Sequence, residues 1–294
     1  MILKAEQLCA AWEQTLIAGA AEGKIHSVFD RAVNLMTAGD IKSVLPAEKG
    51  LYPMSCTVQT GAPFTGMGLH PNMRASVSRA GIQVPEADFE VDFGGAEVRS
   101  LDTWEKVSGN VPARLGLPAL KALLCEQGNG ESMLPLALAR ADTPYSAMIR
   151  PRLPALHEAF LALDPSAAAL AAQAIAGCGI GLTPSSDDML LGYVCAYYPL
   201  ARAKGLDREE TLFMGRSALY AAAEKTNDIS GAFLRQCGDG LASQAILDLL
   251  HALFSGAPEQ RLHASALRIL HIGAASGADI LTGIVLSLQT HGGG

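Results

Sequence analysis

Two adjacent carboxylates, Asp187 and Asp188, follow a run of glycines and hydroxyl side chains and precede a long apolar stretch. The glycines and hydroxyls of this run are Gly177, Gly179, Gly181, Thr183, Ser185 and Ser186. Glycine lets a backbone adopt positive φ and approach a ligand closely. Hydroxyls and carboxylates at the start of a helix lie beside its unpaired amides. The stretch is therefore a candidate for ligand binding or acid–base chemistry, and the alternative is a well-capped buried helix.

The pattern S-x-x-D-x-L-x-G of this stretch, Ser185–Gly192, occurs a second time at Ser276–Gly283. We refer to the two copies as the first and the second motif. A serine followed three residues later by an acid has the spacing of a capping box, in which the serine accepts from an amide of the first turn. In the first motif, Pro184 at the first helical position would instead make Thr183 the cap. The repeat favours Ser185.

Each motif leads into a stretch that is apolar on nearly all sides, which predicts a buried helix. Gly192 and Gly283 fall one turn inside these helices. An interior glycine costs about 1 kcal/mol relative to alanine, so we expect each to permit close contact with another helix. We therefore hypothesise that the two helices pack together in the core, with both N-termini at one pocket.

The N-terminus of a helix attracts anions because of its dipole and its free amides. The loop Gly179–Thr183 is thus predicted to bind a substrate anion, with Ser185 or Thr183 as a hydroxyl donor. The alternative is structural capping, worth about 1 kcal/mol per helix end. No lysine follows the last glycine and no strand pattern precedes the first, which argues against a Walker A or a Rossmann loop.

The carboxylates Asp187, Asp188 and Asp279 have several possible roles. Together they could hold Mg²⁺, act as a general base or orient a substrate amide. Alternatively, Asp188 and Asp279 only cap helices while Asp187 is solvated. Carboxylates would oppose an anionic substrate, which would then require a metal or arginines. The candidate arginines are Arg150, Arg152, Arg216 and Arg235.

A polar turn, Thr226–Ser230, lies between two predicted helices. Thr226 and Ser230 could contribute hydroxyls to the same site. The alternative is a simple helix–helix turn in which Ser230 caps the next helix.

Composition restricts the possible classes of protein. Apolar residues form 49% of the 294 residues but aromatic residues only 5%, which favours closely packed helices, and the net charge of −7 gives no basic surface for nucleic acid. None of the six cysteines forms a C-x-x-C pair, so neither a zinc framework nor a disulfide scaffold is expected. No signal peptide or membrane span is evident, which predicts a cytoplasmic protein.

The sequence pattern changes from strand-like to helical near residue 110. Residues 1–21 are predicted to form a helix, and residues 24–100 have short alternating segments with Gly and Pro turns, which predicts a small, partly closed antiparallel β unit. The turn-rich stretch Trp104–Pro118 indicates a boundary. We expect an α+β protein with a β-rich unit over 1–110 packed on a larger, mainly helical unit over 111–294. Ten helices are predicted in the second unit, at 118–126, 135–141, 154–163, 166–176, 188–200, 208–225, 230–238, 242–253, 258–270 and 279–288.

The first motif and the residues before it read G-x-G-L-T-P-S-x-D-D-x-L-x-G over Gly179–Gly192, with Ser186 where a glycine is usual. This pattern resembles that of the bacterial AllH family. The segments 226–230, 272–281 and 27–29 are also similar to the family.

The resemblance implies a component of a carbamoyltransferase in anaerobic allantoin degradation, a branch of purine catabolism. With two partner subunits, AllF and AllG, the typical member interconverts oxalurate plus phosphate with oxamate plus carbamoyl phosphate. A paralogue would act on a related carbamoyl or ureido anion. Two rival functions are a non-catalytic binding or assembly subunit and a metal-dependent hydrolase that uses the Asp pair.

The residues themselves, and not the family, supply our candidates for the site. The candidate catalytic residues are Asp187, Asp188 and Asp279. The candidate substrate-binding residues are Gly179, Gly181, Thr183, Ser185, Ser186, Thr226, Ser230, Ser276 and Gly277. The expected partners are a small anion of the phosphate, oxamate or oxalurate type and other transferase subunits, with neither nucleic acid nor membrane. No cofactor is required by this chemistry, although Mg²⁺ is possible.

Overall fold

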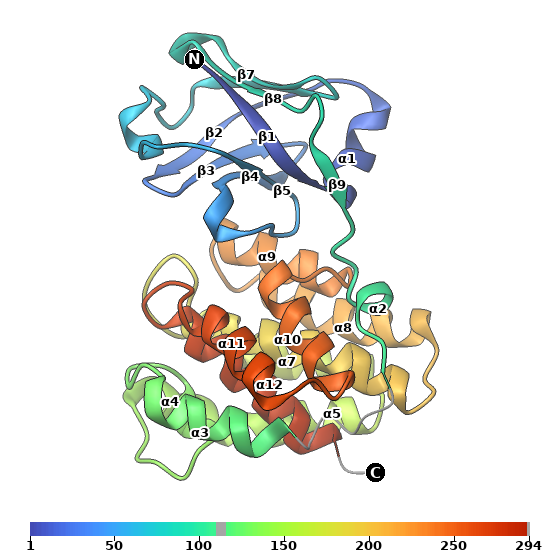
Figure 1. The fold of residues 1–294 in the computed structure, drawn as a ribbon. Helices are drawn as coiled ribbons and strands as arrows, with labels where there is room; N and C mark the ends of the chain where they lie inside the picture. Colours follow the sequence, from blue (N-terminus) through green and yellow to red (C-terminus); the bar gives the residue numbers. More distant parts are fainter. Residues whose placement is uncertain (110–115, 293–294) are drawn as a thin grey trace. The chain divides into compact units, whose positions relative to one another are not determined.

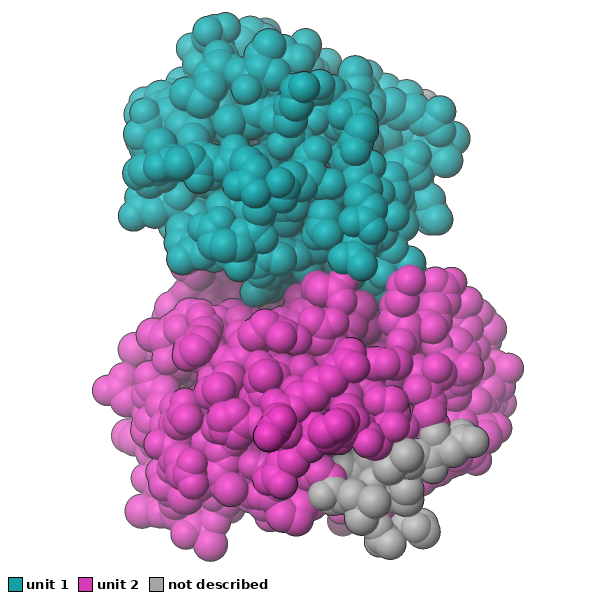
Figure 2. All heavy atoms as spheres, viewed as in Figure 1, with its two compact units in different colours: residues 1–101 teal, residues 102–294 magenta. Residues whose placement is uncertain are grey.

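The computed structural model describes residues 1–109 and 116–292. The chain forms two compact units, Met1–Leu101 and Asp102–Gly294, coloured teal and magenta in Figure 2. The boundary expected between residues 110 and 111 lies outside the described residues, as do Gly293 and Gly294. The expected fold class is confirmed, with a β-rich unit followed by a mainly helical one (Figure 1).

Unit 1 is a nine-stranded sheet that closes on itself in a barrel-like manner. Its strand order is β5-β4-β3-β2-β6-β7-β8-β1-β9, and an additional pairing of β5 with β1 closes it. The strands are β1 Ile2–Cys9, β2 Ala21–Phe29, β3 Ala32–Thr37, β4 Asp40–Pro46, β5 Ser55–Val58, β6 Arg74–Ser78, β7 Gly81–Val84, β8 Phe89–Asp92 and β9 Glu97–Arg99. The sheet is mixed rather than antiparallel throughout, because β1 runs parallel to β8 and β9, and β4 runs parallel to β5.

The prediction of a helix over residues 1–21 is wrong. Residues 2–9 form β1, which is the strand that closes the sheet, and only α1, Ala10–Thr15, is helical with a short 3₁₀ turn, Leu16–Ala18, after it. Leu8, Trp12, Thr15 and Leu16 would lie roughly on one face of such a helix, and of these four Leu8, Trp12 and Leu16 are buried in the structure whereas Thr15 is exposed. Pairing with three other strands decides the conformation of β1, since tertiary contacts override weak local preference.

Unit 2 consists of helices α2 to α12. Their bounds are α2 Thr103–Lys106, α3 Leu117–Gln127, α4 Pro144–Ile149, α5 Leu153–Leu161, α6 Pro165–Ile175, α7 Ser185–Ala203, α8 Arg208–Ala223, α9 Asp228–Gly238, α10 Gln244–Phe254, α11 Glu259–Leu270 and α12 Ser276–His291. The helix predicted at 135–141 is wrong, because only a 3₁₀ turn, Leu134–Leu136, forms there, and α4 was not predicted. Within the described ranges, no helix is both long and apolar enough to cross a membrane.

The two motif helices, α7 and α12, form the most extensive helix–helix contact of the unit (Figure 1). A Cβ on Gly192 would lie 2.0 Å from the carbonyl oxygen of Ile280, and a Cβ on Gly283 would lie 1.9 Å from that of Met189. The backbones of the two helices therefore touch at both glycines. The prediction that these glycines permit close contact between the two helices is confirmed.

Candidate functional site

The N-termini of α7 and α12 lie together. The Thr183 hydroxyl, just before α7, is 3.1 Å from the Ser276 hydroxyl at the start of α12, and it also donates to Asp188 Oδ2 at 2.9 Å. The backbones of the two helices also touch at Gly192 and Gly283, about two turns further along each helix. The expected arrangement, with the two motifs at one place, is therefore present.

The capping boxes predicted for the two motifs are absent. The N-cap positions are Pro184 and Ala275, and no side chain in the described part of the chain caps either helix. Both Ser185 and Ser276 are the first residues inside their helices. Instead of capping, the Ser186 amide of α7 donates to the carbonyl of Cys178, which belongs to the glycine loop.

The glycine loop before α7 requires glycine for its conformation. Gly177, Gly179 and Gly181 all have φ between 76° and 128°, in the region that side chains rarely adopt. A Cβ on Gly179 would also lie 2.5 Å from the Ser185 amide nitrogen. The loop thus lies against the first turn of α7, and the sequence-based expectation of positive φ is confirmed.

Backbone amides in this loop are available to a ligand. None of the amides of Gly179, Ile180, Gly181, Leu182 and Thr183 donates a hydrogen bond to any residue that the structure describes. Ile180 and Leu182 are the exposed side chains of the loop, with 70% and 53% of their surfaces accessible. A loop of free amides before a helix N-terminus has the geometry with which proteins bind small anions.

Asp187 serves to anchor this loop. It accepts from the Gly177 amide at 2.7 Å, from the Thr226 hydroxyl at 2.5 Å and from the Ser230 hydroxyl at 2.7 Å. Asn227 lies in the same turn and donates to the carbonyl of Leu182 at 2.9 Å. The predicted residues Thr226 and Ser230 thus reach the site through Asp187, whose oxygens are already occupied by donors.

Asn227 was not among the predicted site residues. Its side chain caps α9, accepting from the amides of Ile229 and Ser230, while its amide group holds the loop. An Asn before an acidic first turn is a readable N-cap signal. The contact with residue 182 has no such signal in the sequence.

Ser186 fits where a glycine was expected. It lies in the first turn of α7 with a negative φ, and its hydroxyl accepts from the Cys178 amide at 2.8 Å. The equivalent residue of the second motif is Gly277, and a Cβ there would lie 2.0 Å from the carbonyl oxygen of Ile269. The requirement for glycine at Gly277 thus comes from close packing and not from its backbone conformation.

Asp188 and Asp279 are both buried, and no salt bridge compensates either charge in the parts that the structure describes. Burial raises the pKa of Asp188 to about 8, although hydrogen bonds from Ser276 and Thr183 oppose the shift. Burial likewise raises the pKa of Asp279 to about 7, opposed by the Met133 amide and by Ser185. Each carboxyl is thus influenced by the serine of the other motif.

The two oxygens of Asp279 differ. Oδ1 accepts from the Met133 amide at 2.6 Å, whereas Oδ2 is buried and makes no hydrogen bond within residues 1–109 and 116–292. The loop that carries Met133 is held to the turn before α12 by a bond from Asn129 to the carbonyl of Ala274. Met133 was not predicted as a site residue, because its contact is made by its backbone amide and the residue type gives no indication of such a contact.

Raised pKa values change the electrostatic character of the site. Around neutral pH Asp188 is largely protonated, and Asp279 is about half protonated. Neutral carboxyl groups do not repel an anion, and they can donate a hydrogen bond to it. The objection that carboxylates would oppose an anionic substrate is therefore much weaker than the sequence suggested. A pKa near the working pH also suits general acid–base chemistry.

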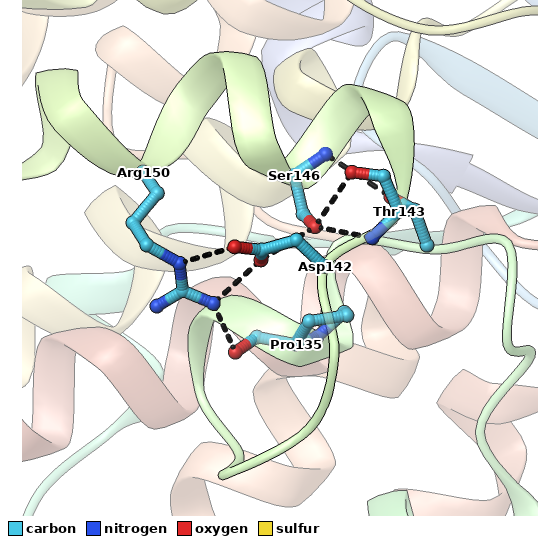
Figure 3. A network of polar contacts seen from close by, with 5 residues as sticks. All are labelled: Pro135, Asp142, Thr143, Ser146 and Arg150. Carbon is cyan, nitrogen blue, oxygen red and sulfur yellow. Dashed lines mark hydrogen bonds and ion pairs between the residues drawn. The ribbon is translucent and has the colours of Figure 1, made fainter.

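Two of the four candidate arginines form ion pairs with other acidic residues. Arg150 forms a bidentate pair with Asp142 and donates to the carbonyl of Pro135, in the network that caps α4 (Figure 3). Arg216 pairs with Asp239. Among the described residues, no Lys or Arg side chain forms a hydrogen bond or ion pair with Asp187, Asp188 or Asp279.

The two remaining candidates make backbone or local contacts. Arg152 donates to the carbonyl of Ala174, and its charge reaches the edge of the loop, where it partly opposes the burial that raises the pKa of Cys178. Arg235 lies against Gly231 within α9. In the described part of the chain, no three His, Cys, Asp or Glu side chains gather as a metal site requires.

Comparison with known families places these features in context. A family model described as oxamate carbamoyltransferase subunit AllH matches residues 175–288, and a model of the AllH family N-terminal domain matches residues 4–98. The first match begins just before the glycine loop and contains both motifs. No solved structure matches the chain. The chain therefore belongs to the AllH family, whose members are described as subunits of oxamate carbamoyltransferase.

Proposed function

We propose that this chain is the AllH component of an oxamate carbamoyltransferase and that the paired N-termini of α7 and α12 bind its small anionic substrates. The observation that carries the proposal is the convergence of the two motifs on one site, with the Thr183 and Ser276 hydroxyls 3.1 Å apart. The family match over residues 175–288 supports the choice of reaction.

The proposed reaction interconverts oxalurate plus phosphate with oxamate plus carbamoyl phosphate. An oxygen of hydrogen phosphate attacks the ureido carbon of oxalurate, and the bond from that carbon to the oxamate nitrogen breaks. This nitrogen takes up a proton, and the proton that the attacking phosphate loses balances it. All of the participants are anions. The free amides of the loop Gly179–Thr183 would bind and orient them, as oriented backbone dipoles do for other anions.

Asp188 and Asp279 are our candidates for the proton transfer. A protonated Asp188 would give its proton to the leaving oxamate nitrogen, and in the reverse direction it would take the proton back. Its pKa of about 8 keeps the acid form populated at neutral pH. Asp279 would hold the carbamoyl amide, because its Oδ2 is an acceptor with no other hydrogen bond inside the described residues.

Asp187, Thr226 and Ser230 would act as positioning residues. Their mutual hydrogen bonds, with the bond from the Gly177 amide, fix the loop whose free amides would bind the substrate. Gly179, Gly181 and Gly277 allow the close backbone approaches on which this arrangement depends. The proposed mechanism uses no metal ion.

The test is reconstitution of the transferase from this chain and the other subunits, with the formation of carbamoyl phosphate measured from oxalurate and phosphate. We expect Asp188→Asn and Asp279→Asn each to lower kcat by about 10²-fold, the lower range for loss of a proton donor or a positioned acceptor. Asp248→Asn is the matched control, since Asp248 lies on α10 and pairs with Arg268.

Two results would overturn parts of the proposal. Full activity of both variants within an assembled complex would leave this chain an assembly role only. Loss of activity on addition of a chelator, restored by Mg²⁺, would favour a metal-dependent reaction. A crystal soaked in phosphate should show density against the amides of Gly179–Ser185.

A further inference from the structure

A cavity of about 200 Å³ opens between the start of α6, the first turns of α8 and the middle of α7. Leu163, Pro165, Leu206, Phe213 and Met214 form its apolar lining. It is separate from the site above, because Tyr197 on its wall is nine residues beyond Asp188, about 13 Å along α7.

We infer that this cavity and its exposed rim are the docking site for a large apolar side chain of another carbamoyltransferase subunit. The inference rests on the proposed function, because it takes its partner from the assembly to which the chain is assigned. Its evidence comes from a different part of unit 2.

The first observation is the backbone of Leu163. Leu163 has a φ of 54°, directly after α5 ends, and the Asp164 amide donates to the carbonyl of Ala159 in the bond that defines a Schellman turn. Glycine is the usual residue at this position, because an L side chain disfavours positive φ. The leucine is only partly buried, since 43% of its surface is exposed. Backbone strain at a partly exposed apolar residue of a cavity wall is an observation that a binding role would explain.

The second observation is the exposure of Phe213. It lies in the second turn of α8 on the same cavity as Leu163, and 58% of its surface is accessible. Aromatic and leucine side chains around a cavity form the kind of pocket that receives an anchor residue in protein interfaces. The volume suits one ring, since an engineered apolar cavity of about 150 Å³ holds benzene.

The third observation is polar and lies inside the cavity. Tyr197 is only 2% exposed, and its hydroxyl is buried with no hydrogen-bond partner in the described ranges. Burial, with the nearby charge of Glu210, raises the pKa of Tyr197 to about 12, so that its phenol stays neutral. A buried hydroxyl without a partner is unfavourable, and a polar group of an incoming side chain or backbone would relieve it by hydrogen bonding.

Charge distinguishes between possible occupants. Glu210 lines the cavity, and Glu209 is the residue before it in the chain. Neither glutamate forms an ion pair with another described residue. A second copy of this chain would bring the same glutamates and a net charge of −7. A different subunit, with an apolar anchor flanked by Lys or Arg, fits the acidic rim better.

The experiment measures binding of the full chain to the other purified subunits of the transferase by titration calorimetry and size-exclusion chromatography. We expect Leu163→Gly and Phe213→Ser each to weaken binding at least tenfold. Leu163→Gly should leave the melting temperature within a few degrees of the wild-type value, because relief of the positive φ opposes the loss of side-chain packing, and this measurement shows that the variant is folded. Leu170→Ser is the control, since Leu170 is 70% exposed on α6 but does not line the cavity.

Wild-type affinity in both variants would overturn the inference. The inference would also be overturned if the wild-type chain formed a dimer that either substitution dissociates. It would likewise be overturned if benzylamine, a small aromatic amine, bound saturably to the chain without changing its affinity for the other subunits. Activity of the mixed subunits separates the two proposals. An active mixture whose binding is unaffected by the variants overturns only the docking site, whereas a stable complex without transferase activity overturns only the proposed reaction.

Discussion

The N-termini of α7 and α12 share the pattern S-x-x-D-x-L-x-G, but different neighbours hold them. The first motif is anchored by side chains, since Asp187 accepts from Thr226 and Ser230. The second has Ala278 at the position equivalent to Asp187 and is anchored by backbone, through the Met133 amide on Asp279. One pattern in the sequence can therefore hold two helix ends by different means, provided that the contact between the helices is preserved.

The comparison also separates the two acids. Asp188 accepts a side-chain hydroxyl and has the higher pKa of the two, whereas Asp279 accepts a backbone amide and has the lower one. Since an amide is a fixed donor and a hydroxyl can rotate, Asp279 is the better placed to stay still and Asp188 the better placed to exchange a proton.

The largest effect is expected from the contact that the two motifs share. Gly192→Ala or Gly283→Ala should lower the free energy of unfolding by more than about 3 kcal/mol, because the new Cβ would meet a backbone carbonyl at 2.0 Å or less. The melting temperature of unit 2 should fall by about 10 °C. Gly130→Ala is the control, since no atom lies within 4 Å of a Cβ there. An unchanged melting temperature would contradict the contact.

The next effect concerns pH. Both carboxyls have folded pKa values above the 3.8 of an unperturbed Asp, so between about pH 4 and pH 8 the folded state binds more protons than the unfolded state. The free energy of unfolding should therefore fall as the pH rises through this window, by about 1.4 kcal/mol per pH unit for each of the two carboxyls that is protonated in the folded state only. Urea unfolding across the window checks this.

Variants divide that window between the two acids. Asp188→Asn should end the pH dependence near pH 7 instead of pH 8, and Asp279→Asn should roughly halve the slope below pH 7 while the dependence still extends to about pH 8. Asp248→Asn, at the surface, should retain the wild-type profile. Stability that rises with pH in the wild type would show that both acids are charged in the folded state.

A smaller effect is expected when the first motif is made like the second. Asp187→Ala removes three hydrogen bonds and leaves the Thr226 and Ser230 hydroxyls without their acceptor, which should cost about 2 kcal/mol. Hydrogen exchange should accelerate at the hydrogen-bonded amides of the first segment, Cys178 and Ser186, and stay unchanged at those of the second, Gly277 and Asp279. Equal acceleration in both segments would show that the two ends are not held independently.

The smallest effect is expected at the hydroxyl that joins the two motifs. Thr183→Val removes the 2.9 Å bond to Asp188, at a cost of about 1 kcal/mol, and should raise the pKa of Asp188 further, since that bond stabilises the charged form. Carboxyl titration by NMR measures the shift. Thr290→Val, which loses a bond to the carbonyl of Leu286 and a contact with Tyr193 at the other end of α12, should leave it unchanged.

The sequence predicted the parts of this site that depend on residue type. The glycine spacing predicted both the strained loop and the contact of α7 with α12, because no other residue fits either environment. Capping was predicted wrongly, since Ser185 and Ser276 have the right spacing but lie one residue inside their helices. In α7 the carbonyl of Cys178, in the glycine loop, accepts from the Ser186 amide of the first turn, so that no side-chain cap is needed for this amide.

Other features depend on contacts between distant segments. Met133 and Asp279 are 146 residues apart, and the donor is a backbone amide that any residue could supply. Strand β1 depends in the same way on pairing with β5, β8 and β9. Local pattern does not encode such partners, which is why the helical unit was predicted more completely than the sheet.

The contact at Gly192 and Gly283 has a mechanical consequence. Since backbone meets backbone there, the two helices cannot approach any closer, and no change of side-chain rotamer could bring them closer. The separation of Asp188 and Asp279 therefore has a lower limit set by contact between the two backbones, and we expect it to vary little with bound substrate. Any opening that admits a ligand must come from the two loops around the helices, those that carry Ile180 and Met133.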